Sequence, residues 1–459
     1  MTGGRYRRAS RDSDRERIVR VLTRARRPLE AGSIAERFGH RTKKQQRALR
    51  RLLTYEAGRP NSLLIRSEGK YDLRRRAERR LRHRVCEALA NQGFSTSEEG
   101  LRTLRPATKD SLRQLHAAAR VEKFRSSLTF IRRCEENLLG YFANGDEIDV
   151  KAIRPRIQVV SSGSDESDLF RYASLLWSVP VSGGFGRRTR FLVWDENNDK
   201  LIGLYALGDP VFNLRCRDAW IGWDHRARSR RLYSVMDIFV LGAVPPYNLL
   251  LGGKLVALAA ASDETRETIQ RRYTGNKTII SGVEKDPRLA LLTTGSALGK
   301  SSLYDRIRCD GRLVYRRIGT SEGYGHFHLN NGLFEALRTY LDATVRGKAS
   351  SYKFGMGPNW RMRTSREALE NLGLSGDLLR HGIRREIYAV PLAPECSSFL
   401  RGETSALTHY SLPFEGASAY WKQRWLLPRA DRKPEYKEFR RTSVPRSVRD
   451  LGGAKALGV

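Results

Sequence analysis

The first eighty residues constrain the fold most strongly, because they join a regular apolar pattern to a large excess of positive charge. They hold 25 Lys or Arg against nine Asp or Glu. Apolar residues recur at helical spacing in Asp14–Leu22, Ile34–Phe38 and Lys43–Tyr55, and Ser62–Leu73 alternates around a Gly-containing turn. Three helices followed by a hairpin predict a winged helix-turn-helix, a fold that places one basic helix in a major groove of DNA.

The third of these helices carries the predicted DNA contacts. Thr42 is the expected N-cap, and Ser33 is the expected N-cap of the helix before it. Apolar residues form one stripe of the third helix, and basic residues cover the opposite face. The residues that we predict to face DNA are Lys43, Lys44, Gln46, Arg47 and Arg50 on this helix, with Lys70 on the hairpin. The alternative is a small structural domain whose basic face is only solvated.

The composition of the whole chain supports a polyanionic partner. Its 459 residues carry a formal net charge of +35, and 40% of them are apolar. Such a field attracts nucleic acid whatever the fold. No apolar run is long enough to span a bilayer, and no membrane partner is expected. Five scattered cysteines without a CxxC motif are typical of a reducing compartment, so we expect a cytoplasmic protein.

Changes in composition and in the apolar pattern along the chain predict an α+β multidomain protein in four segments. Residues 1–76 form the basic winged-helix module, and residues 77–155 read as a helical connector. Residues 156–345 mix strands and helices and form the expected core. Residues 346–459 form a basic, aromatic-rich C-terminal region, where Trp421–Asp450 holds ten basic and four acidic residues. Interleaved aromatics there could stack on bases or pack on their own domain, and the sequence leaves both open.

The element order of the core is similar to that of the GNAT acyltransferases. The expected elements are strands at Ile157–Val160, Thr189–Trp194 and Leu201–Leu207, an apolar stretch at Arg231–Val244, a helix from Leu251, a strand at Leu289–Thr294 and a helix at Ser301–Ile307. In that family a helix N-terminus binds the coenzyme A pyrophosphate, and a Tyr on the later helix often serves as general acid.

This resemblance places a candidate cofactor site at Gly252, Gly253 and Lys254 and a candidate catalytic acid at Tyr304. The usual [QR]xxGx[GA] motif is incomplete, because Asn248–Gly253 keeps only the last glycine. The core is therefore either an acyl-CoA-dependent transferase acting on nucleic acid or protein, or a degenerate platform in which Tyr304 is only packed. The cofactor stays unknown.

Three further patterns have competing interpretations. Gly295–Ser301 reads GxxxGKS, one residue shorter than a P-loop, so an ordinary turn is expected. His326 and His328 form an HxH that would point two imidazoles one way on a strand, but hydrogen-bonded histidines are favoured and no metal is predicted. A set of arginines could form a phosphate cleft or pair internally with carboxylates: Arg187, Arg188, Arg190, Arg215 and Arg217.

Much of the chain, about residues 80 to 440, resembles the Druantia anti-phage defence protein DruA family. The matching strings are Leu175–Ser182, Gly186–Phe191, Leu207–Leu214, Arg217–Trp223, Val244–Tyr247, Leu251–Leu255, Gly323–His328, Phe354–Trp360 and Tyr420–Trp425. One departure is Gly295–Arg306, where the family usually has Thr-Ser-Ala-Leu-Gly-Arg-Ser-Ser-x-Tyr-Asn-Arg. The resemblance implies a bacterial role in defence or on a mobile element. Together with the charge of the chain, it predicts a DNA-binding component of a Druantia-type defence system, with a helicase or other defence proteins as candidate partners. A transposon-associated DNA-binding protein is the alternative, and no mechanism is implied.

Overall fold

The computed structural model describes residues 3–59, 62–97, 100–103, 108–181, 186–277, 282–309, 311–345 and 360–449. The chain divides into two compact units. Unit 1 combines Met1–Arg105 with Tyr324–Gly382, and unit 2 combines Pro106–Gly323 with Ile383–Val459. Many helices surround one large mixed sheet, which confirms the α+β class. The division into four segments stays a prediction. Within the described residues, no helix has the length and apolarity needed to cross a membrane.

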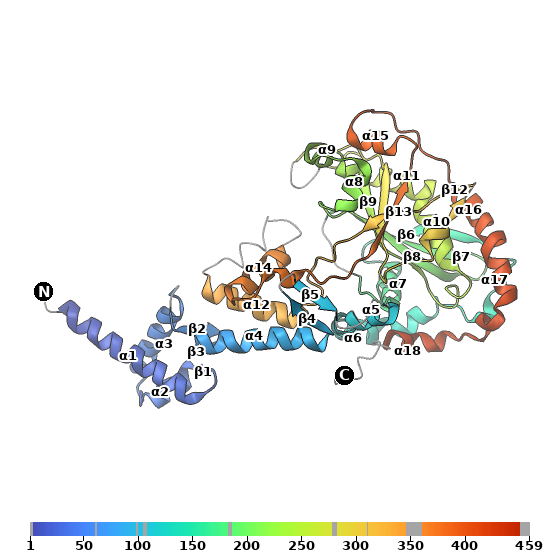
Figure 1. Cartoon of the computed structure of the whole chain (residues 1–459). Helices are drawn as coiled ribbons and strands as arrows, with labels where there is room; N and C mark the ends of the chain where they lie inside the picture. The colour runs from blue at the N-terminus through green and yellow to red at the C-terminus, as the bar shows by residue number, and fades with distance from the viewer. Residues whose placement is uncertain are drawn as a thin grey trace. The chain divides into compact units, whose positions relative to one another are not determined.

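Unit 1 begins with three helices and a small sheet (Figure 1). The elements are α1 (Gly3–Ala25), β1 (Leu29–Glu30), α2 (Ala31–Arg37), α3 (Lys43–Ala57), β2 (Leu64–Ser67) and β3 (Lys70–Leu73), with sheet order β1-β3-β2. Thr42 caps α3 in a reciprocal capping box with Gln45, as predicted. The predicted Ser33 cap is wrong, because α2 starts at Ala31 and places Ser33 inside its first turn.

The hairpin of unit 1 has a two-residue turn. Glu68 and Gly69 both have positive φ, 50° and 77°, and Ser67 pairs with Lys70 on either side of them. Such primed turns match the twist of the flanking strands. A separate apolar core lies beneath the hairpin and helices, with Leu49 and Leu53 of α3 packed among its buried side chains.

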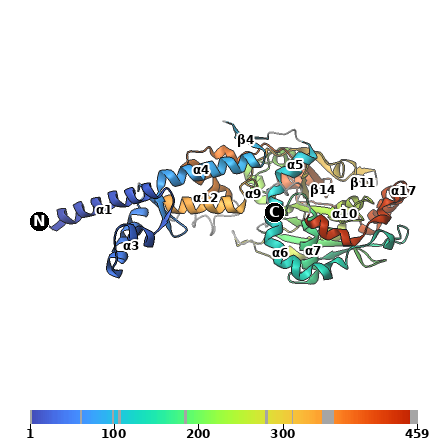
Figure 2. The same cartoon turned by 90° about the horizontal axis from the view of Figure 1, so that it is seen from below.

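The remainder of unit 1 joins the first chain segment to the second (Figure 2). Its elements are α4 (Arg74–Asn91), β4 (Phe94–Ser97), β5 (Gly100–Thr103), α12 (Asn331–Thr344), α14 (Trp360–Asn371) and η5 (Gly376–Leu379). The Leu101 amide donates to the Arg380 carbonyl at 2.9 Å. The predicted strand around the HxH is wrong, since His326 and His328 lie in an irregular loop and His328 Nε2 bonds the Leu378 carbonyl at 2.9 Å.

Unit 2 is built on a seven-stranded sheet. Its strands are β6 (Pro155–Val159), β7 (Arg188–Asp195), β8 (Lys200–Gly208), β9 (Val235–Ala243), β10 (Leu291–Gly295), β13 (Arg316–Thr320) and β14 (Glu386–Pro391), in the order β13-β14-β10-β9-β8-β7-β6. The strands predicted from the sequence up to β10 are confirmed. β9 and β10 are parallel, and every other neighbouring pair is antiparallel. The parallel pairing ends at Asp237 opposite Thr293, and one residue further on the Thr294 hydroxyl donates to the Ile238 carbonyl at 2.9 Å.

Helices cover both faces of this sheet. α6 (Ala117–Leu139) and α7 (Asp165–Ala173) pack on the face that carries Leu192, whereas α10 (Gly252–Ala261) and α16 (Phe414–Trp421) pack on the face that carries Val193. The further helices are α5 (Lys109–Leu115), α8 (Arg215–Ile221), α9 (His225–Arg231), α11 (Asp263–Tyr273), α15 (Cys396–Arg401), α17 (Leu427–Arg432) and α18 (Val444–Arg449), with short turns η1 (Gly145–Glu147), η2 (Ser174–Leu176), η3 (Leu232–Ser234), η4 (Tyr304–Arg306), η6 (Lys422–Leu426), η7 (Pro434–Glu438) and η8 (Arg441–Ser443) and a hairpin of β11 (Arg308–Cys309) and β12 (Arg312–Leu313). The helix predicted at Ser301–Ile307 is wrong, because only the single turn η4 forms there.

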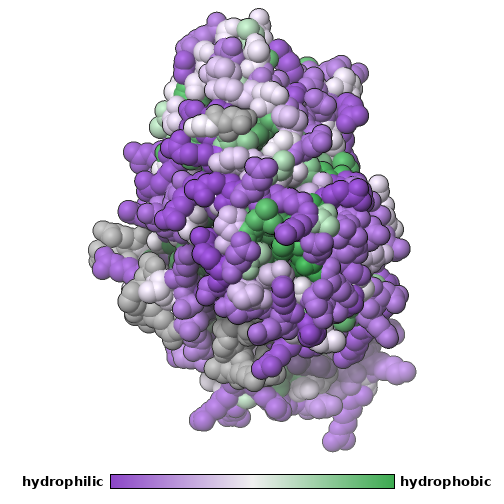
Figure 3. Space-filling model, turned by 90° about the vertical axis from the view of Figure 1, so that its right-hand side faces the viewer, coloured by the Kyte–Doolittle hydropathy of each residue, from purple (hydrophilic) through white to green (hydrophobic). Residues whose placement is uncertain are grey.

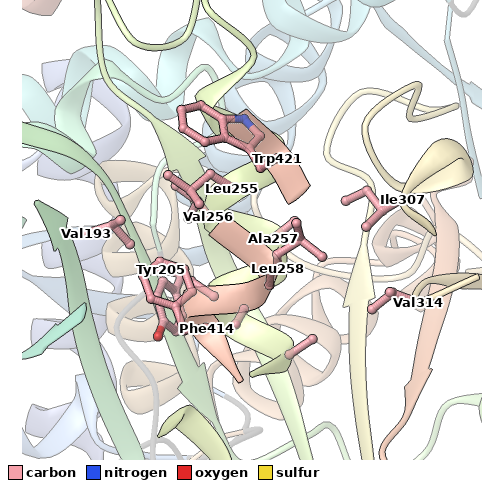
Figure 4. Packing of buried hydrophobic residues seen from close by; sticks show 14 of the residues in the cluster. Val193, Tyr205, Leu255, Val256, Ala257, Leu258, Ile307, Val314, Phe414 and Trp421 are labelled. Carbon is pink, nitrogen blue, oxygen red and sulfur yellow. The ribbon is translucent and has the colours of Figure 1, made fainter. Parts of the chain in front are cut away.

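The C-terminal region belongs to the core of unit 2. Figure 4 shows Trp421 and Phe414 among the side chains that pack around α10, together with Val193 and Tyr205 of the sheet. Trp421 is fully buried, and its Nε1 donates to the Leu251 carbonyl at 3.1 Å. Of the two interpretations of the aromatic tail, the described residues support packing on its own unit.

Candidate functional site

The outer face of α3 is exposed and positively charged. Lys43, Lys44, Arg47, Arg50 and Arg51 are all solvent-exposed, while Leu49 and Leu53 point into the core. Within the described residues, none of these five side chains forms an ion pair. The apolar stripe fixes the rotation of α3, and that rotation leaves five cations facing water. Because these cations have no carboxylate partner, each of them is available to contact a phosphate group of a polyanion.

The other two residues predicted to face DNA differ in their surroundings. Gln46 is exposed, but its Nε2 donates to the His40 carbonyl at 3.2 Å, so its amide is held against the preceding loop. Lys70 is exposed at the start of β3, directly after the Glu68–Gly69 turn. Both therefore stay accessible, Lys70 on the hairpin and Gln46 beside the helix start.

Most of the arginines predicted to line a phosphate cleft brace the fold instead. Arg187 Nε donates to Asp209 at 2.7 Å, and one of its terminal nitrogens donates to the Tyr233 carbonyl at 2.7 Å. Arg217 is fully buried and binds Asp218 as well as two backbone carbonyls of the preceding loop. Such pairing is the alternative that the sequence left open.

The remaining arginines of that set lie in three different places. Arg190 donates to the Ser167 hydroxyl at 3.0 Å, and the Arg188 guanidinium stacks over the Phe239 ring, 4.0 Å from its centre. Arg215 is exposed and pairs with Glu322 at 3.3 Å. These hydrogen bonds, ion pairs and ring contacts of the five arginines thus go to separate partners within the fold, although the charges of Arg188 and Arg217 both act on Asp237.

Asp237 lies at the last paired position between β9 and β10. The Thr293 hydroxyl donates to it at 3.0 Å, and the charges of Arg217 and Arg188 act on it. Burial raises the pKa of Asp237 to about 6, against the opposing effects of Thr293 and the two arginines. This carboxyl therefore titrates closer to neutrality than an exposed one.

The start of α10, the candidate cofactor site, is covered by the C-terminal segment. A Cβ on Gly252 would lie 2.7 Å from the Tyr247 carbonyl oxygen, so the chain itself requires glycine there. Lys254 is only 8% exposed, and its ammonium lies 4.8 Å from the centre of the Trp425 ring. Burial, together with the charges of Arg306 and Arg424, lowers the pKa of Lys254.

Tyr304, the candidate catalytic acid, is buried in a cluster of aromatic rings. It stacks on Tyr315 with ring centres 4.9 Å apart and lies 5.1 Å from the ring centre of Tyr388. Burial raises the pKa of Tyr304 to about 12. A phenol in this position is held firmly in its neutral form.

A cavity of about 810 Å³ opens beside the end of β10 in unit 2. Its lining residues are Lys109, Lys300, Ser302, Asp305, Arg306, Arg317 and Glu386. Lys300 follows directly on the GxxxGKS glycine, and the expected turn is present there, but β14 and η4 supply the acidic groups. Sequence reasoning missed Asp305, Glu386, Lys109 and Arg317, because no motif connects segments this far apart in the chain.

Charge alone does not single out this cavity on the surface. Figure 3, which views the molecule from the side of α17, shows a largely hydrophilic face with one hydrophobic area near its middle. A candidate site therefore needs converging groups in addition to charge. The exposed face of α3 and the cavity beside β10 each bring several cations together with fewer carboxylates to pair them.

Comparison with known proteins gives the chain its family. The family model "Druantia protein DruA" matches residues 106–402, which is more than half of the chain. The chain belongs to the DruA family. A "Druantia protein DruA" of Escherichia coli (strain UMEA 4076-1) is 45% identical to it over 366 residues, covering 78% of this chain and 89% of the relative. No solved structure matches this DruA family member. The family match begins after α3, so the basic helix lies outside it.

Proposed function

We propose that this DruA family member is the DNA-binding component of a Druantia-type bacterial anti-phage defence system. Family membership and the name of the 45% identical relative support the defence role. In this proposal the protein works in the cytoplasm with a helicase or other proteins of the same system. The net charge of +35 supports a polyanionic partner.

The unpaired basic face of α3 is the observation on which DNA binding depends. The element order α1-β1-α2-α3-β2-β3 and the sheet order β1-β3-β2 support a winged-helix assignment. In that fold the third helix enters the major groove and the hairpin lies beside it. We assign phosphate contacts to Lys43, Lys44, Arg47 and Arg50 of α3. In this assignment, Lys70 contacts the adjacent DNA backbone from the start of β3, and Gln46 lies on the same exposed face of α3.

Salt dependence of DNA binding by the full chain tests this assignment. Each phosphate contact contributes about 0.9 to the slope of log affinity against log salt. The double variant Lys44→Gln, Arg47→Gln should therefore lower the slope by about 1.8. A control variant, Arg432→Gln with Lys437→Gln, removes two exposed cations from unit 2 and should leave the slope as it is. Equal slopes in all three proteins would refute the α3 assignment.

An acyl-CoA-dependent transferase is the second candidate function. It is supported by the order of elements in unit 2, which is similar to that of the GNAT acyltransferases and places strand β9 directly before α10. Trp421 and Trp425 weigh against it, because they pack on the start of α10, where the pyrophosphate would bind.

Titration with acetyl-CoA in a calorimeter separates the transferase from a platform of the same plan. Micromolar binding that is abolished by Gly253→Trp would favour the transferase, with Gly252, Gly253 and Lys254 at the pyrophosphate and Tyr304 as acid. The absence of heat at millimolar acetyl-CoA would exclude it and leave the platform. The α3 assignment does not depend on either result.

A further inference from the structure

We propose that the cavity beside β10 binds a small ligand carrying two or more adjacent phosphate groups, of the nucleoside diphosphate or triphosphate class. This site lies in unit 2, whereas the proposed DNA contacts lie on α3 in unit 1. It is therefore a second binding function, separate from the DNA binding proposed above. Three properties of the cavity carry the proposal: its unpaired cations, its carboxylate wall and its size.

The cations that line the cavity outnumber the carboxylates. Lys109 comes from the first turn of α5, Lys300 from the turn after β10, and Arg306 from η4. Within the described residues, none of these three forms an ion pair, and only Arg317 does, with Glu386 at 2.8 Å. Three like charges facing one cavity repel one another, so the fold holds them at an energetic cost. Phosphate oxygens would relieve that repulsion and accept several charge-assisted hydrogen bonds at once.

Two further cations, Lys254 and Arg424, lie near Arg306. Arg306 and Arg424 both act on the buried amine of Lys254, and no acidic group contributes to the shift of its pKa. The Lys254 ammonium also has no hydrogen-bond partner among the described residues. Lys254 is the buried member of this group, whereas Lys109, Lys300, Arg306 and Arg424 are solvent-exposed, so their charges stay accessible to a phosphate ligand.

The acidic wall of the cavity consists of Asp305 and Glu386, and Tyr388 organises both carboxylates. Its hydroxyl lies 2.6 Å from Glu386 Oε2 and 2.9 Å from Asp305 Oδ1. A hydroxyl has one proton, so it can donate to only one of these two carboxylates. Glu386 is the closer acceptor and is also bound by Arg317, which leaves Asp305 able to accept a hydrogen bond from a ligand.

These two kinds of lining group together define the chemistry of the ligand. Phosphates suit Lys109, Lys300 and Arg306, whereas Asp305 and Glu386 repel phosphate but accept hydrogen bonds from hydroxyl or amino groups. A nucleotide has phosphates at one end and ribose hydroxyls at the other. The volume of about 810 Å³ falls within the usual range for small-molecule sites, about 300–1,000 Å³.

Calorimetry on the full chain with ADP, inorganic pyrophosphate, adenosine and a short oligothymidylate tests the proposal. We expect ADP to bind at micromolar concentration, pyrophosphate more weakly, and adenosine at least a hundredfold more weakly than ADP. Lys300→Gln with Arg306→Gln should weaken ADP binding at least tenfold. The control pair Arg432→Gln with Lys437→Gln should bind ADP as the unaltered protein does. Asp305→Asn should weaken ADP but leave pyrophosphate unchanged, which tests the acidic wall by itself.

Several results would overturn the proposal. They are the absence of heat with millimolar ADP, equal ADP affinity in the Lys300 and Arg306 variant, and adenosine binding as tightly as ADP. Oligothymidylate binding without ADP binding would show that the cavity takes phosphates from a nucleic-acid strand, if Lys300→Gln with Arg306→Gln abolishes it and Lys44→Gln with Arg47→Gln does not. Lys44→Gln with Arg47→Gln should bind ADP normally, so failure of the DNA assignment and failure of this one can be told apart.

Discussion

Replacing Trp421 by alanine should destabilise unit 2 severely. Trp421 is fully buried against α10, and its indole nitrogen donates to the Leu251 carbonyl at 3.1 Å. Truncating a buried tryptophan costs about 3–5 kcal/mol of unfolding free energy, because packing contacts are lost and a cavity remains. The unpaired Leu251 carbonyl adds about 1 kcal/mol. We therefore expect a loss of about 4–6 kcal/mol, a large part of the stability of an ordinary domain.

Hydrogen exchange in increasing urea measures this loss in unit 2 alone, if it is followed on peptides from β8 and β9. With a urea dependence of about 3 kcal/mol per molar, the midpoint should fall by roughly 1.3–2 M. Trp421→Phe keeps most of the volume and should cost less than half as much. Val211→Ala, at a side chain that is 62% exposed, should change the midpoint little. A midpoint for Trp421→Ala within 0.3 M of the unaltered protein, about 1 kcal/mol, would refute the view that the C-terminal region completes this core.

Three further predictions concern single residues. Arg217→Met should cost about 2–4 kcal/mol in urea unfolding, because it leaves the Val211 and Phe212 carbonyls without this donor and Asp218 with Arg228 as its remaining ion-pair partner; a loss below 1 kcal/mol would contradict this. The pKa of Asp237 rises from 3.8 to about 6 on folding, so its stabilising contribution is complete below pH 3.8 and is lost as the pH rises through 6. Asp237→Asn should therefore flatten the stability profile between about pH 4 and 7, and an unchanged profile would count against the shift. Gly145→Ala should lower the melting temperature by several degrees, since a Cβ there would lie 1.9 Å from the Tyr436 carbonyl oxygen, whereas Gly32→Ala meets no atom within 4 Å and should not.

Local signals in the sequence were reliable where neighbouring residues decide the structure. The Thr42 capping box, the apolar stripe of α3 and the alternating strands of unit 2 all depend on residues within one turn or one strand. The predicted Ser33 cap failed because Glu30 in extended conformation starts α2 earlier. The predicted helix at Ser301–Ile307 failed because only one 3-10 turn forms at Tyr304–Arg306 before the chain enters β11 at Arg308.

Long-range features could not be predicted in the same way. Glu386 and Asp305 are separated by about eighty residues of sequence, and β14 brings them to one hydroxyl only because it pairs with both β10 and β13. Arg217 was a candidate phosphate ligand in the sequence, but its carboxylate partner is its own neighbour in the chain. Composition gives the number of charges, and only the fold decides which of them remain unpaired. The string Phe354–Trp360 lies largely outside the described residues, so its role stays a prediction.

The composition of unit 1 from two separate chain segments affects how the protein can be synthesised. During translation, Met1–Arg105 leaves the ribosome long before Tyr324–Gly382, which completes the same unit. Phe94 and Leu101 of the first segment are buried in the finished unit, where Phe94 contacts Phe327 and Leu101 bonds to Arg380. Those surfaces stay exposed until most of unit 2 has been made, a period in which a nascent chain is open to chaperones and to misassembly. A protein fragment that ends at Arg105 would lack the segment Tyr324–Gly382, so the surfaces around Phe94 and Leu101 would stay exposed.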